Sequence, residues 1–222
     1  MELLAGIEWT EQAEGYFLGR GAKLSTAQTM CLGEWAGAEV SDESFSVRYG
    51  KNGDSLLGWW CWPLRTPTNR IVGIEFRNPE YKKSVRHLLH DEADPHAVWT
   101  CRPDSFQRIW DGGAVWLCEG LFDMCALEWV VPSTDAVLAC GRANLNKKQA
   151  ESLRRLAPPY VHVVFDRDDA GERGAEFAAK SLTAVGLRHG VVSYGGGKDP
   201  GELWSKGGKK AVVTAFGGGV GC

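Results

Sequence analysis

The second half of the chain alternates between short apolar segments and helix-like segments, and this alternation constrains the fold more than any other feature. Strands are expected at 114–118, 136–140, 160–165 and 191–194, and helices at 121–130, 147–156 and 170–184. Strands that alternate with helices form a parallel sheet with right-handed crossovers. Such sheets bind their ligands beyond the carboxyl ends of the strands. We therefore expect an α/β domain with a crevice at that edge.

Acidic residues follow three of these expected strands. Glu119 comes directly after the first, Asp166 directly after the third, and Asp199 shortly after the fourth. The third strand leads into a turn that also contains Asp168 and Asp169. Crowded carboxylates repel one another, so they take up protons or bind a cation. Hard oxygen ligands without a thiol or imidazole partner favour Mg²⁺ or Mn²⁺ over zinc, which indicates chemistry on phosphates.

Each acidic position also has a purely structural explanation. Asp168 or Asp169 would cap the following helix, since Asp is favoured at N-caps and near the positive end of the helix dipole. Glu119 would belong to a tight strand-to-helix turn, and Asp199 with Pro200 to a plain turn. Together these explanations require three coincidences at one edge of one sheet. We therefore favour a shared site.

The first part of the chain has a different pattern. Two helices are expected within residues 8–36, separated at Arg20–Gly21 and ending at Gly33. Strands are expected at 44–49, 56–64 and 71–76, while residues 79–112 allow no clear assignment. The expected organisation is an α+β subdomain at 1–112, an α/β domain at 113–205 and a C-terminal helix or tail at 206–222.

A local excess of positive charge lies in this first part, although the whole chain has a net charge of −3. Between Pro63 and His90 only Glu75 and Glu80 oppose the basic residues, which are Arg65, Arg70, Arg77, Lys82, Lys83 and Arg86. Such a strip is expected where one face meets a polyanion. On charge alone, an ordinary solvated surface with ion pairs is at least as good an explanation as a polyanion-binding face.

Composition argues against several other classes of protein. Seven cysteines, with no CxxC pair, argue against a disulfide framework and a zinc ribbon. No apolar run approaches the ~18 residues of a membrane span, and the acidic N-terminus lacks the basic region of a signal peptide. We therefore expect a cytoplasmic protein with no membrane partner.

Ten tryptophans suggest stacking on bases, but core packing is the expected role for most of them. Trp59, Trp60 and Trp62 fall in one expected strand. Alternation places Trp60 and Trp62 on one face of that strand and Trp59 on the other.

The acidic motifs resemble those of a known domain. Glu119-Gly120 with Asp123, and Asp166-x-Asp168 with Ala170-Gly171, are similar to the two signatures of the Toprim domain, which primases, type IA and type II topoisomerases and several nucleases share. The resemblance extends to the catalytic core of bacterial replicative primases of the DnaG type and their phage relatives. The further segments that carry it are Tyr16–Gly21 with Leu32-Gly33, Trp62–Leu64, Arg70–Arg77, and Asp199-Pro200 with Glu202–Trp204.

The resemblance implies an enzyme that copies a single-stranded DNA template from nucleoside triphosphates, with Mg²⁺ or Mn²⁺ as cofactor. The implied catalytic residues are Glu119, Asp166 and Asp168. The implied metal ligands are Glu119, Asp123, Asp166, Asp168 and Asp199, with Glu119 alternatively a general base and Asp123 alternatively a support for Glu119. The expected contacts to template or triphosphate are Arg65, Arg77, Lys82, Lys83, Arg86 and Lys198.

Departures from the resembled family leave alternatives open. The chain has no zinc-binding cluster and stops before any helicase-binding region. We therefore expect a zinc protein or a replicative helicase to act in trans. The chain would then come from a phage or mobile element, or be a fragment. Gly201 stands where the family often has Asp or Asn, so this position supplies no side-chain ligand for a second metal ion. The alternatives are another Toprim enzyme, such as a nuclease or topoisomerase fragment, and a non-catalytic nucleic-acid-binding accessory.

Overall fold

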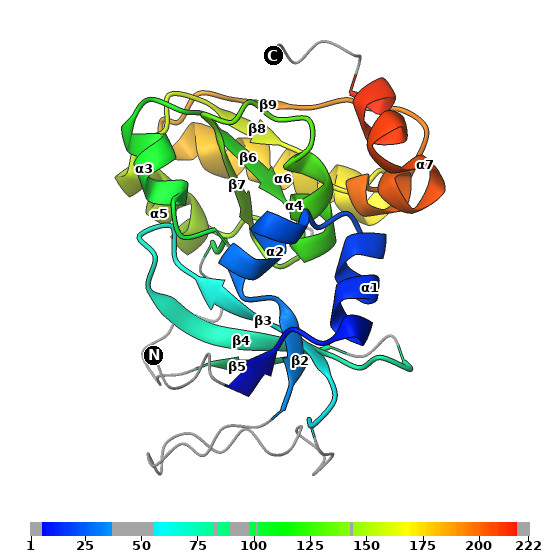
Figure 1. Ribbon diagram of the computed structural model, residues 1–222. Coiled ribbons are helices and arrows are strands. Elements are labelled where there is room, and N and C mark those ends of the chain that lie inside the picture. Colours follow the sequence, from blue (N-terminus) through cyan, green and yellow to red (C-terminus); the bar gives the residue numbers. More distant parts are fainter. Residues whose placement is uncertain are drawn as a thin grey trace.

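The computed structural model describes residues 6–36, 56–81, 84–88, 98–100, 102–142 and 144–216, which form two sheets with helices between and around them (Figure 1). The first sheet is antiparallel, with the strand order β1-β2-β3-β4-β5. The second sheet is parallel, with the order β7-β6-β8-β9. The expected α/β fold, in which a parallel sheet follows a smaller α+β part, is confirmed.

The antiparallel sheet and two helices make up the first part of the chain. Its strands are β1 (Ile7–Glu8), β2 (Gly33–Trp35), β3 (Trp60–Arg65), β4 (Ile71–Arg77) and β5 (Ser84–Leu88). Its helices are α1 (Glu11–Gly19) and α2 (Leu24–Met30), which lie between the two sheets in Figure 1. The Thr10 side chain begins α1 by accepting a 3.1 Å hydrogen bond from the amide of Ala13. The strand expected at 44–49 lies outside the described residues.

The prediction that the second helix continues to Gly33 is wrong. The helix ends at Met30, and Gly33 instead begins β2, which pairs with β1. A β-carbon at position 33 would collide with the main-chain oxygen of Glu8. Gly33 is therefore needed for the close approach of β1, a role that the sequence pattern does not distinguish from that of a helix stop.

Tryptophans in β3 and directly before it pack into the core on both faces of the first sheet, as predicted. Trp60 and Trp62 are buried beside Phe17 of α1. Trp59, just before the strand, lies in a separate buried group with Trp35. Their rings therefore serve packing, and the cluster that contains Trp62 joins the first sheet to the second.

The parallel sheet and its helices make up the second part of the chain. The strands are β6 (Val115–Cys118), β7 (Ala136–Ala139), β8 (Val161–Val163) and β9 (His189–Val191). The helices are α3 (Ser105–Trp110), α4 (Leu121–Leu127), α5 (Lys147–Leu156), α6 (Asp169–Ala184) and α7 (Pro200–Ala215). All residues of β6 and β7 are buried, as is usual for parallel strands covered on both faces. The expected strand and helix alternation is confirmed.

Two elements near the C-terminal end differ from expectation. The last strand was expected at 191–194 but lies at His189–Val191, where pairing with β8 overrides the low strand propensity of Gly190. A helix begins at Pro200, with Asp199 as its N-cap, and bends at Gly207–Gly208. A proline in the first turn after a capping aspartate is a standard start of a helix.

The two faces of the parallel sheet pack against different layers. Trp116 and Cys118 of β6 belong to the core that includes α4 and the first sheet, and Val115 and Leu117 belong to the core under α5 and α6. α7 packs against α4, and Figure 1 shows it at one end of the sheet. This arrangement brings the ends of β6 and β8 close to the start of α7. Among the described residues, no helix combines the length and apolarity needed to cross a membrane.

Candidate metal centre

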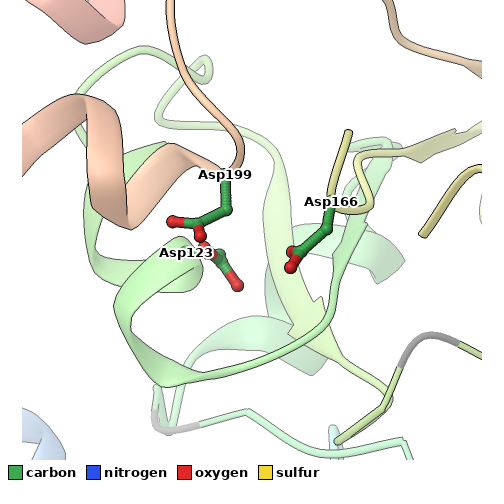
Figure 2. A group of neighbouring side chains, drawn as sticks. All are labelled: Asp123, Asp166 and Asp199. Carbon is green, nitrogen blue, oxygen red and sulfur yellow. The ribbon is translucent and has the colours of Figure 1, made fainter. Parts of the chain in front are cut away.

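Three aspartates from distant segments point toward one another at the carboxyl edge of the parallel sheet (Figure 2). Asp123 lies in the first turn of α4, Asp166 follows β8, and Asp199 caps α7. One carboxylate oxygen from each residue lies within 4.8 Å of the other two. The sheet topology therefore gathers acidic residues that the sequence separates widely.

Main-chain amides hold these carboxylates in place. The amide of Gly201 donates a 3.2 Å hydrogen bond to Asp123, and the amide of Glu202 donates a 2.6 Å hydrogen bond to Asp199. The amide of Asp166 donates a 3.0 Å hydrogen bond to Glu119, which directly follows β6. Glu119 thus lies beside the three aspartates and lines the same pocket.

Burial and mutual repulsion raise the pKa of three carboxyl groups in the pocket, those of Glu119, Asp123 and Asp166. Burial, followed by repulsion from Asp199 and Asp166, raises the pKa of Asp123 to about 8. Burial also raises the pKa of Glu119 to about 7, against the hydrogen bond from the Asp166 amide. The pKa of Asp166 is raised by burial as well, although Lys198 opposes the shift. A cation among these groups would relieve both the repulsion and the cost of burial.

The donor set fits a hard divalent cation. Among the described residues that line the pocket there is no histidine or cysteine, so the ligands on offer are carboxylate oxygens. Oxygens bound to one Mg²⁺, each about 2.1 Å from the ion, are at most about 4.2 Å apart. The three aspartate oxygens, within 4.8 Å of one another, need only a small adjustment to meet that limit. Oxygen-only sets of this kind suit Mg²⁺ or Mn²⁺.

Gly201 is packed tightly against the cluster. A β-carbon there would lie 3.2 Å from the β-carbon of Phe122, 3.3 Å from Asp199 Oδ1 and 3.5 Å from Asp123 Oδ1. The amide of Gly201 reaches Asp123, but the residue offers no side chain to a second cation. The neighbouring Glu202 accepts a hydrogen bond from the Lys198 amide and pairs with Lys206 at 3.0 Å.

Asp168 lies outside the group of three. Its carboxylate caps α6 by accepting hydrogen bonds of 3.1 Å and 2.9 Å from the amides of Ala170 and Gly171. It also pairs with Lys198 at 2.9 Å, and Lys198 reaches Asp166 at 3.1 Å. The helix-cap explanation therefore describes Asp168 well, and Lys198 links it to the cluster.

Arginines line the pocket together with the acids. The pocket has a volume of about 580 Å³, and its lining includes Arg20, Arg77 and Arg142. The guanidinium groups of Arg20 and Arg77 lie over the Phe122 ring, 4.7 Å and 5.4 Å from its centre. A planar guanidinium is well suited to bind phosphate oxygens in pairs. The pocket therefore presents carboxylates and guanidinium groups to the same space.

Of the other basic residues named in the first part of the chain, the structure describes Arg65 in full and Arg86 in its main chain. Arg65 is 8% exposed, does not line the pocket and donates a 3.1 Å hydrogen bond to Asn69. Arg86 lies in β5, where its main chain is in register with Glu75. Lys82 and Lys83, and the side chain of Arg86, lie outside the described part of the chain.

Sequence reasoning did not assign Arg20, Glu75 or Arg142 to the site. Arg20 falls in the segment 16–21 and Glu75 in 70–77, so the resemblance had marked both segments without giving these residues a role. Arg142 comes just after β7 ends, at the same edge as Glu119. The rule that ligands bind beyond the carboxyl ends of parallel strands would have identified it.

The parallel sheet with its acidic edge defines a Toprim-like domain. The sequence model of the Toprim-like family matches residues 116–204, a range that contains Glu119 and all three clustered aspartates. This domain assignment, expected from the motifs, is confirmed. A comparison of the sequence with curated proteins found no match.

Solved structures extend the likeness to nearly the whole chain. A structure of the Aquifex aeolicus primase with its zinc-binding and RNA polymerase domains is 19% identical, with a TM-score of 0.71, over 94% of this chain and 56% of that one. The RNA polymerase domain of Mycobacterium tuberculosis primase DnaG is 21% identical, with a TM-score of 0.67, over 92% and 74%. A DnaG primase catalytic domain bound to single-stranded DNA is 16% identical, with a TM-score of 0.70, over 93% and 71%.

The chain thus has the fold of DnaG-type primase catalytic cores, while spanning little more than half of the Aquifex chain. At these identities the likeness establishes the fold. What the fold does in this chain has to be argued from the pocket.

Proposed function

We propose that this chain is a primase catalytic core, which copies single-stranded DNA into short primers from nucleoside triphosphates with the help of a divalent cation. The observation that carries the proposal is the composition of one pocket. It is lined by the three clustered aspartates and Glu119 and also by three arginines, Arg20, Arg77 and Arg142. A nucleotidyl transfer needs both kinds of group. The acidic residues would hold the divalent cation, and the arginines would bind the anionic triphosphate.

The clustered aspartates are the proposed cation ligands. Asp123, Asp166 and Asp199 would hold Mg²⁺ or Mn²⁺, which when bound would neutralise charge on the reacting phosphate and make the attacking hydroxyl more acidic. In this proposal Asp168 is not a ligand of the cation. It pairs with Lys198, which also pairs with Asp166.

Glu119 is the proposed proton acceptor, or else a further ligand. Its pKa of about 7 lies close to working pH, which is where a general base is most effective. The hydrogen bond from the Asp166 amide fixes one of its oxygens and leaves the other to act in the pocket. An acceptor so placed could take the proton of an attacking hydroxyl.

Arg20 and Arg77 are the proposed phosphate contacts. Both lie over the Phe122 ring, and this contact limits the positions that their guanidinium groups adopt. Lys82, Lys83 and Arg86 are proposed as further sequence-independent contacts to the template. Arg65 has no part in the proposal, because it is buried and already donates to Asn69.

Relatives of the same fold support the choice of substrate. A DnaG primase catalytic domain has been solved with single-stranded DNA, and the Mycobacterium tuberculosis RNA polymerase domain with double-stranded DNA. In our proposal the first 112 residues bind the template and residues 113–205 carry the chemistry. A zinc-binding protein or a replicative helicase would act as a partner in trans.

The test is a priming assay with single-stranded DNA, labelled nucleotides and Mg²⁺ or Mn²⁺. New short oligomers would support the proposal. Shortening of the template would instead indicate a Toprim nuclease, and retention of DNA without either reaction would indicate a non-catalytic accessory.

A further inference from the structure

Lys198 forms ion pairs at the edge of the aspartate cluster. Its ammonium nitrogen lies 3.1 Å from Asp166 Oδ2 and 2.9 Å from Asp168 Oδ2. Asp166 belongs to the group of three, and Asp168 does not. Lys198 therefore forms an ion pair with one carboxylate inside the cluster and one outside it.

The main chain of Lys198 is held firmly, while its side chain is exposed. The amide donates a 2.6 Å hydrogen bond to Glu202, and the carbonyl accepts a 2.7 Å hydrogen bond from the amide of Arg167. The Tyr194 hydroxyl also lies 3.0 Å from this carbonyl. The side chain, by contrast, is 50% exposed. A rotation of that side chain would move the ammonium group without disturbing Asp199, the next residue.

The ammonium group pairs with a carboxylate that a cation in the cluster would also use. Among the described residues, Lys198 is the cation that pairs with Asp166. A divalent cation held by Asp166 would lie close to this ammonium, and two like charges at such a distance repel each other. Asp168 gives the ammonium a second partner outside the cluster, so it has a place to remain after leaving Asp166.

We propose that Lys198 is a built-in competitor of the divalent cation: it neutralises Asp166 in the cation-free protein and withdraws toward Asp168 when the cation binds. This inference rests on the cation site described under the proposed function and adds a control on its affinity. Lys198 sets that affinity below what the carboxylates alone would give. In the cation-bound state its ammonium remains paired with Asp168.

The competition predicts an increase in affinity when the charge is removed. Lys198→Met keeps an unbranched chain of the same length as the lysine stem and loses the ammonium. Because the competitor is gone, Mn²⁺ should bind about three- to tenfold more tightly at low ionic strength, with a smaller gain at high salt. If Lys198 instead served to orient Asp166 as a ligand, the same variant would bind Mn²⁺ more weakly.

The experiment is a titration of the full chain with Mn²⁺ alone, followed by the electron paramagnetic resonance signal of free Mn²⁺, without DNA or nucleotide. Lys198→Arg, which keeps the charge, and Lys180→Met, which removes an exposed charge on α6, are the controls. Both should stay within about twofold of the unaltered chain, and thermal unfolding should show that all variants are folded.

Unchanged or weaker Mn²⁺ binding by folded Lys198→Met would overturn the inference, as would an equal gain in Lys180→Met. An unaltered chain that binds no Mn²⁺ would remove the cation site and the inference together. Tight Mn²⁺ binding with the expected gain, in a chain that makes no primers, would contradict the proposed function and leave the role of Lys198 standing.

Discussion

The main-chain amide of Asp166 donates a 3.0 Å hydrogen bond to a carboxylate oxygen of Glu119, which lies 47 residues earlier in the chain. The bond joins the segments that follow β6 and β8, which are neighbours in the parallel sheet. It fixes the separation of two acidic side chains by a contact that does not depend on a bound cation. Glu119 therefore positions the loop that carries Asp166, in addition to any chemical role.

Loss of charge at these two residues should stop primer synthesis and leave the fold intact. Glu119→Gln and Asp166→Asn preserve side-chain size, and Gln can still accept the hydrogen bond through its carbonyl oxygen. Each should lower the yield of labelled primers by about 10²-fold or more, because a ligand or proton acceptor is lost. Asp169→Asn, three positions from Asp166 and exposed on α6, is the matched control and should be neutral. Unchanged synthesis in both site variants would refute the assignment.

The cation-free protein should become less stable as the pH rises from acidic to mildly alkaline. The pKa of Asp123 is about 8 in the folded chain and about 3.9 in an unfolded chain. A raised pKa means that the proton favours the folded state, so this contribution is complete below about pH 4 and is lost progressively up to about pH 8. The melting temperature, measured without divalent cations, should fall across that range. Asp123→Asn should flatten the profile, and an equally steep profile in this variant would exclude Asp123 as its source.

Binding of the cation should strengthen with pH for the same reason. A proton must leave Asp123 before its oxygen can serve as a ligand, and the pKa of Glu119, about 7, adds to the effect if Glu119 also binds. Mn²⁺ affinity measured by calorimetry should therefore fall by about tenfold for each pH unit below about 8, and by up to about a hundredfold for each unit below 7 if Glu119 also binds, with release of protons on binding. Affinity that does not change between pH 6 and 8 would show that the buried carboxyl groups take no part.

A side chain at position 201 should disturb the cluster. In Gly201→Ala the new β-carbon would lie 3.2 Å from the β-carbon of Phe122 and 3.3 Å from Asp199 Oδ1, so one of these neighbours has to move. The expected cost is about 1–3 kcal/mol in the free energy of unfolding, together with weaker cation binding. Gly195→Ala is the matched control, because a β-carbon at that position would meet nothing within 4 Å. Equal stability of the two variants would contradict the packing argument.

Removal of a pocket arginine should weaken DNA binding and make it less dependent on salt. Arg77→Ala should lower the affinity for single-stranded DNA and reduce the slope of log K against log salt by about 0.7, the value for one phosphate contact. Lys82→Ala with Lys83→Ala should flatten the slope further if both contact the template. Arg154→Ala, on α5 and exposed, should leave the slope unchanged. A slope that Arg77→Ala does not alter would remove Arg77 from the interface.

The sequence was sufficient to predict the parallel sheet and the edge at which its acidic residues meet. Short apolar strands and amphipathic helices carry their own patterns, and the topology rule then places Glu119, Asp166 and Asp199 at one edge. The sequence could not separate a capping aspartate from a clustered one. Asp168 and Asp199 both precede a helix, and only the packing of α7 against α4 brings Asp199 to Asp123.

Features that depend on long-range contacts were not predictable. Gly33 looks like a helix stop until β1 is known to pack against it. Arg65 is one of six basic residues in its stretch of sequence, yet it is buried, while Arg20 reaches the pocket from the end of α1. The charge pattern allowed either a polyanion-binding face or an ordinary solvated surface, and it did not identify which arginines would line the pocket.

We propose that Asp123, Asp166 and Asp199 hold one divalent cation between them. A crystal soaked in Mn²⁺, with diffraction recorded at the manganese absorption edge, would locate that cation directly. We expect an anomalous peak among these three carboxylates, within about 2.0–2.3 Å of an oxygen from each. A map with no peak there, or with the three side chains turned away from one another, would contradict it.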